Sequence, residues 1–384
     1  MNISGNQRWD EDIAKYTQII KLDSKNAEAH YNRGATYDEK GECDKALADY
    51  SKAIELNSEY SLAYNDRGTI YFTRGQYDLA ILDFNKAIEL NPSYDKAYNN
   101  LGIVYHKSKQ YDTALSNYSK AIELDSESAQ FYNNRGSAYD AMGQYDLAIS
   151  DCSKAIELNP KYALAYYNRG SAYRKSGQYD MAIRDFSKAI ELNPEDCAYS
   201  YRGQAYQSKG QFDLAMNDYN TAIILNPKYA VAYNNRGLAY TALGQLDMAI
   251  NDYNTATKLN SCDPITYYNR GGYYYSMGQY NKAISDFSKA VELNPKYTLA
   301  YYDRGSAFLQ SGQYDKAISD FSKAIELNPK FVFAFSNRGM SYHKKGQLNL
   351  AIADFEKVID LSSDVALINN ARGGIDQIKR ELRT

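Results

Sequence analysis

Large and small apolar residues recur along this chain in blocks with helical spacing, and short polar breaks separate the blocks. Residues 163–194 contain two such blocks, whose marker residues are Tyr166, Gly170, Tyr173, Ala182, Phe186 and Ala189. Gly177 lies between the blocks and suits the end of a helix, because left-handed backbone costs little in a residue without Cβ. Pro194 follows the second block, and proline cannot continue a helix. The pattern therefore predicts two short helices in this stretch.

Nearly the same 34 residues recur from Ala27 to Val365. A period of this length marks a stack of helical repeats, in which each copy packs only on its neighbours. With Ala163 as position 1, the ten copies begin at Ala27, Ser61, Asp95, Ala129, Ala163, Asp196, Ala230, Pro264, Thr298 and Val332. Small residues at positions 8, 20 and 27 let two helices approach closely, and large residues at positions 4, 11 and 24 fill the space between them.

Each copy has an aromatic residue at position 4, Gly at 8, Tyr at 11, Ala at 20, an aromatic residue at 24, Ala at 27 and Pro at 32, with few departures. This pattern resembles the tetratricopeptide repeat (TPR) over almost the whole chain. The resemblance implies an all-α fold in which antiparallel helix pairs, helix A and helix B, stack into a right-handed superhelical solenoid of about ten repeats. It also implies that helix A lines a concave groove, which positions 2, 5, 6, 9, 12 and 13 face.

The repeat frame also predicts how the chain divides. Residues 1–8 are expected to be disordered, and residues 9–26 to form an N-terminal half repeat that consists of helix B alone. Residues 27–365 hold the ten repeats, and residues 366–384 are expected to form a capping helix with a polar face, which exposed solenoid ends need. The half repeat at the start suggests that the chain is cut from a longer protein. The fifth and sixth copies start 33 rather than 34 residues apart, so we expect an altered docking angle between them.

The composition argues against several functional classes. The net charge is −3 and the isoelectric point about 5.8, whereas nucleic-acid binding requires a basic face, so no nucleic-acid partner is expected. The first residues lack the apolar run of a signal peptide, and no stretch is long enough to span a membrane. The four cysteines form no CxxC pair, which favours a reduced, cytoplasmic setting.

The sequence carries no catalytic constellation. His30, His106 and His343 lie far apart in helix A, and neither an HExxH motif nor a phosphate-binding glycine loop occurs. The 40 tyrosines fall largely at packing positions of the repeat, which favours a core role over a cofactor site. We therefore expect no enzyme activity, no metal and no cofactor.

Position 7, which is usually apolar in the family, is arginine in nine of the ten copies, and position 23 is aspartate in nine. The two exceptions, Leu101 and Asn117, both lie in the third copy. This joint exception predicts that the arginine and the aspartate of one copy pair through two parallel hydrogen bonds and tie helix A to helix B. The alternative is that each arginine extends independently into water.

Position 6 of helix A is asparagine in seven copies, namely Asn32, Asn100, Asn134, Asn168, Asn235, Asn269 and Asn337. Asparagine is a mediocre helix former, so its recurrence in mid-helix needs a cause. Its amide offers a donor and an acceptor side by side, the complement of a peptide group. The row resembles the asparagine ladder in the repeat superhelix of the O-linked N-acetylglucosamine transferase, which implies that it holds the backbone of an extended peptide. The alternative is that these amides bond to neighbouring helices or only to water.

Asp66, Tyr201 and Asp303 interrupt this asparagine row. The hydrogen bonds of the row contribute about 0.5–1.5 kcal/mol each, whereas association costs on the order of 4–15 kcal/mol. The row alone therefore cannot bind a partner tightly, and apolar contacts must contribute.

Positions 2 and 12 turn from polar to apolar toward the C-terminus. Tyr268, Tyr275 and Tyr302 are predicted to form an aromatic patch with Leu309, and Gly272 makes room beside it. We expect this half of the chain to anchor an apolar peptide segment or a partner helix, because surplus exposed apolar area marks binding sites. The alternative is that the superhelix closes on itself or on a second copy.

The predicted function is a non-catalytic protein–protein interaction scaffold that binds an extended peptide or partner segment in the concave groove. Family members that hold the acidic C-termini of heat-shock chaperones carry lysine at position 5 and asparagine at position 9. Neither occurs in this chain, so no carboxylate clamp is expected. Two further interpretations stay open: the substrate-recognition region of a larger enzyme such as a glycosyltransferase, and a homo-oligomerisation element.

Overall fold

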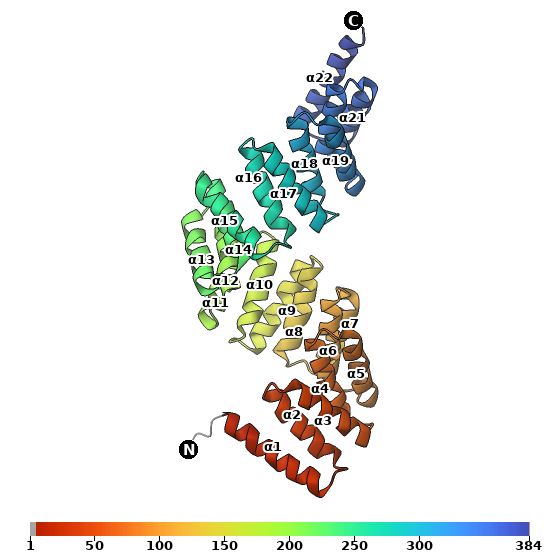
Figure 1. Cartoon of the computed structure of the whole chain (residues 1–384), viewed down its shortest axis with the longest axis vertical. Helices are drawn as coiled ribbons and strands as arrows, with labels where there is room; N and C mark the ends of the chain where they lie inside the picture. Colours follow the sequence, from red (N-terminus) through yellow and green to blue (C-terminus); the bar gives the residue numbers. More distant parts are fainter. Residues whose placement is uncertain (1–4, 384) are drawn as a thin grey trace. The chain divides into compact units, whose positions relative to one another are not determined.

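The computed structural model describes residues 5–383, which form helices joined by short turns (Figure 1). No strand occurs within these residues, so the expected all-α fold is confirmed. The chain divides into two compact units, residues 1–194 and residues 195–384. In both units the helices follow one another as antiparallel pairs.

The first unit contains α1 (Gly5–Leu22), α2 (Ala27–Glu39), α3 (Cys43–Leu56), α4 (Ser61–Thr73), α5 (Tyr77–Leu90), α6 (Asp95–Lys107), α7 (Tyr111–Leu124), α8 (Ala129–Ala141), α9 (Tyr145–Leu158), α10 (Ala163–Lys175) and α11 (Tyr179–Leu192). The second unit contains α12 (Asp196–Ser208), α13 (Phe212–Leu225), α14 (Ala230–Ala242), α15 (Leu246–Leu259), α16 (Pro264–Ser276), α17 (Tyr280–Leu293), α18 (Thr298–Gln310), α19 (Tyr314–Leu327), α20 (Val332–Lys344), α21 (Leu348–Leu361) and α22 (Val365–Glu381). The even-numbered helices from α2 to α20 are helix A of the ten repeats and begin at position 1. The odd-numbered helices from α3 to α21 are helix B and begin at position 17.

The turn from helix A to helix B needs left-handed backbone at one residue. Gly177 has a φ of 80° there, and eight further glycines with positive φ take the equivalent place in other repeats. The third repeat has Lys109 instead, with a φ of 59°. A side chain disfavours this conformation, so the turn of the third repeat is the least favourable of the set.

Helix A and helix B of one repeat approach closely because position 8 lacks a side chain. A Cβ atom on Gly170 would lie only 3.1 Å from Cε1 of Phe186, which is fully buried. The core is a succession of small clusters, each shared by two repeats. In one of them, Tyr219 packs with Ala215 of its own helix and with Ala239 of the next repeat.

Each helix A packs most extensively against helix B of its own repeat and less against the helices of neighbouring repeats. The boundary between the two units falls between Pro194 and Glu195. This is the loop in which the repeat frame lacks one residue. The altered docking angle expected at this loop stays a prediction.

The disorder predicted for residues 1–8 is wrong for residues 5–8, because α1 begins at Gly5. Residues 1–4 lie outside the described residues. Contacts with the first repeat hold this helix in place: Trp9 Nε1 donates to Glu39 (3.2 Å), and Lys40 Nζ donates to Asp10 (2.7 Å). The helix therefore continues through the polar residues that precede Trp9.

The last helix, α22, starts one residue before the predicted capping helix. Its buried residues Ala371, Ile375 and Ile378 pack in one cluster with Phe355 of the tenth repeat. The remaining positions of α22 are largely polar and exposed, with Arg372 as an example. The helix thus covers the apolar end of the tenth repeat.

Candidate peptide-binding groove

The predicted arginine–aspartate pair is present in nine repeats. In the fifth repeat, Arg169 Nε donates to Asp185 Oδ2 (2.6 Å) and Nη2 donates to Oδ1 (2.8 Å). The nine pairs are Arg33–Asp49, Arg67–Asp83, Arg135–Asp151, Arg169–Asp185, Arg202–Asp218, Arg236–Asp252, Arg270–Asp286, Arg304–Asp320 and Arg338–Asp354. The prediction is confirmed, and the alternative of independent arginines in water is wrong.

The same arginines also connect successive repeats. Nη1 of Arg169 donates to Ser153 Oγ of the preceding repeat (3.0 Å). The guanidinium lies 5.7 and 5.9 Å from the ring centroids of Tyr166 and Tyr173. The hydrogen bonds to Asp185 raise the pKa of Arg169, although burial alone would lower it. The arginine at position 7 is therefore a structural residue that is held from four sides.

The asparagine row donates its hydrogen bonds to the preceding repeat. Nδ2 of Asn168 donates to Oδ1 of Asn133, which occupies position 5 one repeat earlier (2.9 Å). The same bond joins Asn100 to Asn65, Asn134 to Asn99 and Asn269 to Asn234, while Asn235 donates to Ser200 Oγ and Asn337 to Tyr302 Oη. These amides thus bond to neighbouring helices, which is the alternative stated for them.

The bonding between repeats limits what the asparagine row can offer a ligand. One N–H of each bonded amide is already used, and Asn235 is only 7% exposed. Asn32, at the start of the row, is partly buried. Peptide binding by these seven asparagines stays a prediction, and their established contacts are structural.

The two aspartates that interrupt the row each bond to the residue at position 5 of the preceding repeat. Tyr31 Oη donates to Asp66 (2.8 Å), and Tyr268 Oη donates to Asp303 (2.6 Å). In both cases position 5 of the preceding repeat is tyrosine rather than asparagine. The direction of the bond is reversed: position 5 donates to the carboxylate at position 6, whereas elsewhere the amide at position 6 donates to position 5, and the contact between repeats is kept.

The three predicted groove tyrosines are partly buried in two neighbouring clusters of the second unit. Tyr268 and Tyr275 pack around Phe287, whereas Tyr302 packs with Leu309 around Phe321. Three tilted ring contacts accompany them: Tyr268 with Tyr297 (4.9 Å between centroids), Tyr275 with Tyr280 (5.5 Å) and Tyr302 with Phe331 (4.9 Å). Ile284 contacts both clusters. Each ring therefore packs partly against the core, and the rest of the side chain is accessible.

Gly272 lies between Tyr268 and Tyr275 on one face of α16. It is exposed, and a Cβ atom built on it would meet nothing within 4 Å. The surface at Gly272 is therefore open, and its role in making room for a partner beside the tyrosines stays a prediction.

Position 2 of helix A carries an exposed apolar side chain in four successive repeats of the second unit. The four residues, which we call the apolar row, are Val231 (37% exposed), Ile265 (53%), Leu299 (48%) and Phe333 (51%). Sequence reasoning noted that position 2 becomes apolar but did not place these residues in the site. Four consecutive apolar residues at a position that is Glu, Lys or Gln in three earlier repeats were the signal.

In the sixth and seventh repeats, position 12 forms a hydrogen bond with the core tyrosine at position 24. Tyr219 Oη donates to Gln207 Oε1 (2.8 Å), and the hydroxyls of Tyr253 and Thr241 lie 3.1 Å apart. In the next repeat position 24 is Phe287, which needs no such partner, and position 12 is Tyr275. The hydrogen bond between positions 12 and 24 therefore has no counterpart in the eighth repeat.

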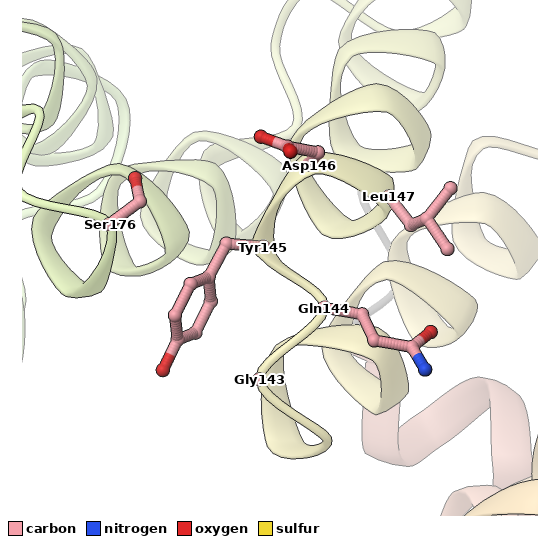
Figure 2. A pocket seen from close by; sticks show the side chains of 6 residues that line it. All are labelled: Gly143, Gln144, Tyr145, Asp146, Leu147 and Ser176. Atoms are coloured by element: carbon pink, nitrogen blue, oxygen red, sulfur yellow. The ribbon is translucent and has the colours of Figure 1, made fainter.

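A cavity of about 320 Å³ opens at the turn between α8 and α9, and Figure 2 shows it. The Tyr145 ring lies on the side of Ser176, whereas Gln144 and Leu147 point away from it. A cavity of about 310 Å³ occupies the equivalent place at Gly278–Lys282. Because the same hollow recurs at the same turn, it results from the stacking of repeats.

Within residues 5–383, no group of three or more His, Cys, Asp or Glu side chains is placed to hold a metal ion. None of the helices in that range combines the length and the apolar character that crossing a membrane requires.

Sequence models of a repeat family match most of this chain. The tetratricopeptide repeat model matches residues 27–60, 129–162, 163–196, 264–297 and 298–331, and a second tetratricopeptide repeat model matches residues 321–353. A TPR repeat model matches residues 68–109, 104–143, 203–244 and 237–275. A search of curated protein sequences finds no match.

Several solved structures have a similar fold. The chain is similar to one in the crystal structure of the APC/C heterotetramer Cut9–Hcn1, at 15% identity and a TM-score of 0.55, over 97% of this chain and 93% of that one. It is also similar to yeast Tom70, at 17% identity and a TM-score of 0.51, over 98% of this chain and 93% of that one. A MamA structure aligns at 32% identity and a TM-score of 0.40 over 45% of this chain and 95% of that one. At their low identities, the first two likenesses concern the fold.

Proposed function

This chain belongs to the tetratricopeptide repeat family, and we propose that it is a non-catalytic scaffold that binds a peptide segment of a partner protein on the A helices of its second unit. The observation that carries this proposal is the apolar row of Val231, Ile265, Leu299 and Phe333. Each of these side chains is more than one-third exposed, at a position where a soluble surface is normally polar.

The asparagines contribute less to this proposal than the apolar row. In six of the seven, an N–H of the amide is used between repeats, so we assign them mainly to the geometry of the groove wall. Tyr268, Tyr275 and Tyr302 are partly exposed on α16 and α18, the helices that also carry Ile265 and Leu299 of the apolar row. A partner with apolar side chains therefore gains burial that hydrogen bonds alone would not supply.

The test uses twelve-residue peptides selected from a random phage-display library on the immobilised full chain. The selected peptides are synthesised, and their affinity is measured by fluorescence anisotropy. We expect the variant Leu299→Ala/Phe333→Ala to bind them at least tenfold more weakly, because each truncation removes about 1–3 kcal/mol of apolar burial. Leu164→Ala is the matched control, since Leu164 is exposed at position 2 of the first unit and lies outside the apolar row. Unchanged affinity in the double variant would contradict the proposal.

A homotypic contact is the second candidate, and one surface favours it. Seven of the ten B helices carry a Lys–Glu pair on their exposed face, such as Lys188–Glu191, but α13 has Thr221 and Ile224 there. Ile224 is 77% exposed, and Leu214 and Leu225 are also exposed on this helix. We expect self-association through this face to show as a concentration-dependent mass in light scattering, which Ile224→Asp abolishes. A constant monomer mass would exclude this candidate.

The role as a substrate-recognition region of a larger enzyme, the absence of enzyme activity and the cytoplasmic location stay predictions. So does the absence of a chaperone carboxylate clamp.

A further inference from the structure

Asp303 differs in its hydrogen-bond partners from the aspartates at position 23 and from Asp66. The nine aspartates at position 23 each accept two hydrogen bonds from an arginine. Asp66, the equivalent of Asp303 in the second repeat, accepts from Tyr31 on one oxygen and from Asn65 on the other. Asp303 accepts from Tyr268 on Oδ2, and no ion pair to it occurs within residues 5–383.

Asp303 is partly buried, and tyrosines lie around it. Burial raises the pKa of Asp303, and the hydrogen bond from Tyr268 offsets this only in part. Burial also raises the pKa of Tyr275, Tyr297 and Tyr302, and the negative charge of Asp303 raises each of them further. A partly desolvated carboxylate thus lies among tyrosines without a neighbouring cation to balance it.

The residue types around Asp303 suit a cation. The face of a tyrosine ring attracts ammonium and guanidinium groups, and a desolvated carboxylate attracts them more strongly than an exposed one does. We assign the space for such a group to the surface at Gly272, which is exposed and where a Cβ atom would meet nothing within 4 Å. A larger residue at this position would fill that space.

We propose that Asp303, together with Tyr268, Tyr275 and Tyr302, forms a binding site for one lysine or arginine side chain of the partner peptide. The inference rests on the proposed function, because it assumes that the peptide runs along the A helices of the second unit. Ile265 and Leu299 of the apolar row belong to the same two helices, α16 and α18, as these residues. The partner segment therefore combines apolar side chains with a basic residue.

The decisive variant is Asp303→Asn, which removes the charge and keeps the shape. The chain itself contains the resulting combination, since Asn337 donates to Tyr302 Oη of the preceding repeat (3.0 Å), so the variant is expected to fold. Its thermal unfolding, followed by circular dichroism, verifies this. Asp66→Asn is the matched control, because it removes an equal charge from the equivalent position in the first unit.

The probes are the phage-selected peptides described above and synthetic versions of them in which the basic residue is replaced by norleucine or citrulline. We expect the peptides selected on the wild-type chain to be enriched in lysine or arginine. Their affinity should fall about tenfold with Asp303→Asn and stay unchanged with Asp66→Asn. Replacing the basic residue should cost about the same factor with the wild type and nothing further with Asp303→Asn.

Three outcomes would overturn this inference while leaving the proposed function intact. The first is that the selected peptides are not enriched in basic residues. The second is that the wild type and Asp303→Asn bind the peptides with equal affinity. The third is that Asp66→Asn loses as much affinity as Asp303→Asn, which would reflect only the overall charge. Failure of the proposed function is distinguishable, because in that case Leu299→Ala/Phe333→Ala also leaves peptide binding unchanged.

Discussion

Arg169 binds Asp185 through two parallel hydrogen bonds of 2.6 and 2.8 Å, and this contact joins helix A to helix B within one repeat. Only 8% of the Asp185 side chain is exposed, so the carboxylate depends on the guanidinium for its hydrogen bonds. The third repeat replaces the pair with the buried Leu101 and with Asn117, which donates to the Thr113 carbonyl. The chain thus contains its own example of a repeat without the charges.

We expect Arg169→Ala to destabilise the fold by about 3 kcal/mol, because it leaves Asp185 buried and without its cation. The double variant Arg169→Leu/Asp185→Asn, which copies the third repeat, should recover most of that loss. The measurement is the free energy of unfolding in urea, followed by helical circular dichroism. Equal losses in the single and the double variant would show that the pair is not the source of the effect.

We expect the hydrogen bonds that the asparagine row makes between repeats to stabilise the folded chain. Asn168→Ala removes the donor for Asn133, which is only 1% exposed, and we expect a loss of about 1–2 kcal/mol. Asn32→Ala is the matched control, because the Asn32 side chain makes no such bond within the described residues. The same urea titration tests both variants. If both lose equal stability, the bonds between repeats do not stabilise the stack.

The turn of the third repeat can be improved by one substitution. Lys109 has a φ of 59°, whereas the other nine repeats have glycine with positive φ at this place. Lys109→Gly should stabilise the chain by about 1 kcal/mol, because glycine adopts left-handed backbone without a steric cost. Gly177→Ala should destabilise it by a similar amount. The midpoints of urea denaturation check both signs, and a less stable Lys109→Gly variant would contradict the argument.

The buried tyrosines predict a loss of stability at alkaline pH. Burial raises the pKa of Tyr253 from 10.0 to about 12, although the hydrogen bond with Thr241 lowers it in part. Above pH 10 the unfolded chain releases this proton while the folded chain retains it. The stability that the neutral phenol provides below pH 10 is therefore lost as the pH rises toward 12.

The variant Tyr253→Phe isolates this effect, because five other repeats carry phenylalanine at position 24. Between pH 8 and pH 11, we expect it to lose about 1 kcal/mol less stability than the wild type. Tyr77→Phe is the control, since Tyr77 is 39% exposed, and it should follow the wild type. Urea titrations at the two pH values provide the comparison. Identical losses for Tyr253→Phe and the wild type would contradict the assignment.

The positions of the repeats and their helices could be predicted from the sequence alone. The 34-residue period placed the start of every helix A, and the joint exception of Leu101 and Asn117 revealed the Arg–Asp pair, because the two positions lie in the same repeat. Such contacts belong to a single short segment, so its pattern carries the information. The helical start of α1 at Gly5 escaped this reasoning, since it depends on contacts of Trp9 and Asp10 with the first repeat.

The sequence by itself determined the repeat, the helix pairs and the contacts within a repeat, because local spacing and covariation encode them. Only the tertiary structure decided where the groove side chains point. Asn168 offers the same amide to a peptide or to Asn133, and the stacking of successive repeats directs it to the latter. The stacking of repeats likewise places Asp303 beside Tyr268, whereas the aspartates at position 23 each bind an arginine. The physical reason is that these contacts join positions 5 and 6 of different repeats, and their geometry exists only once the helices are packed.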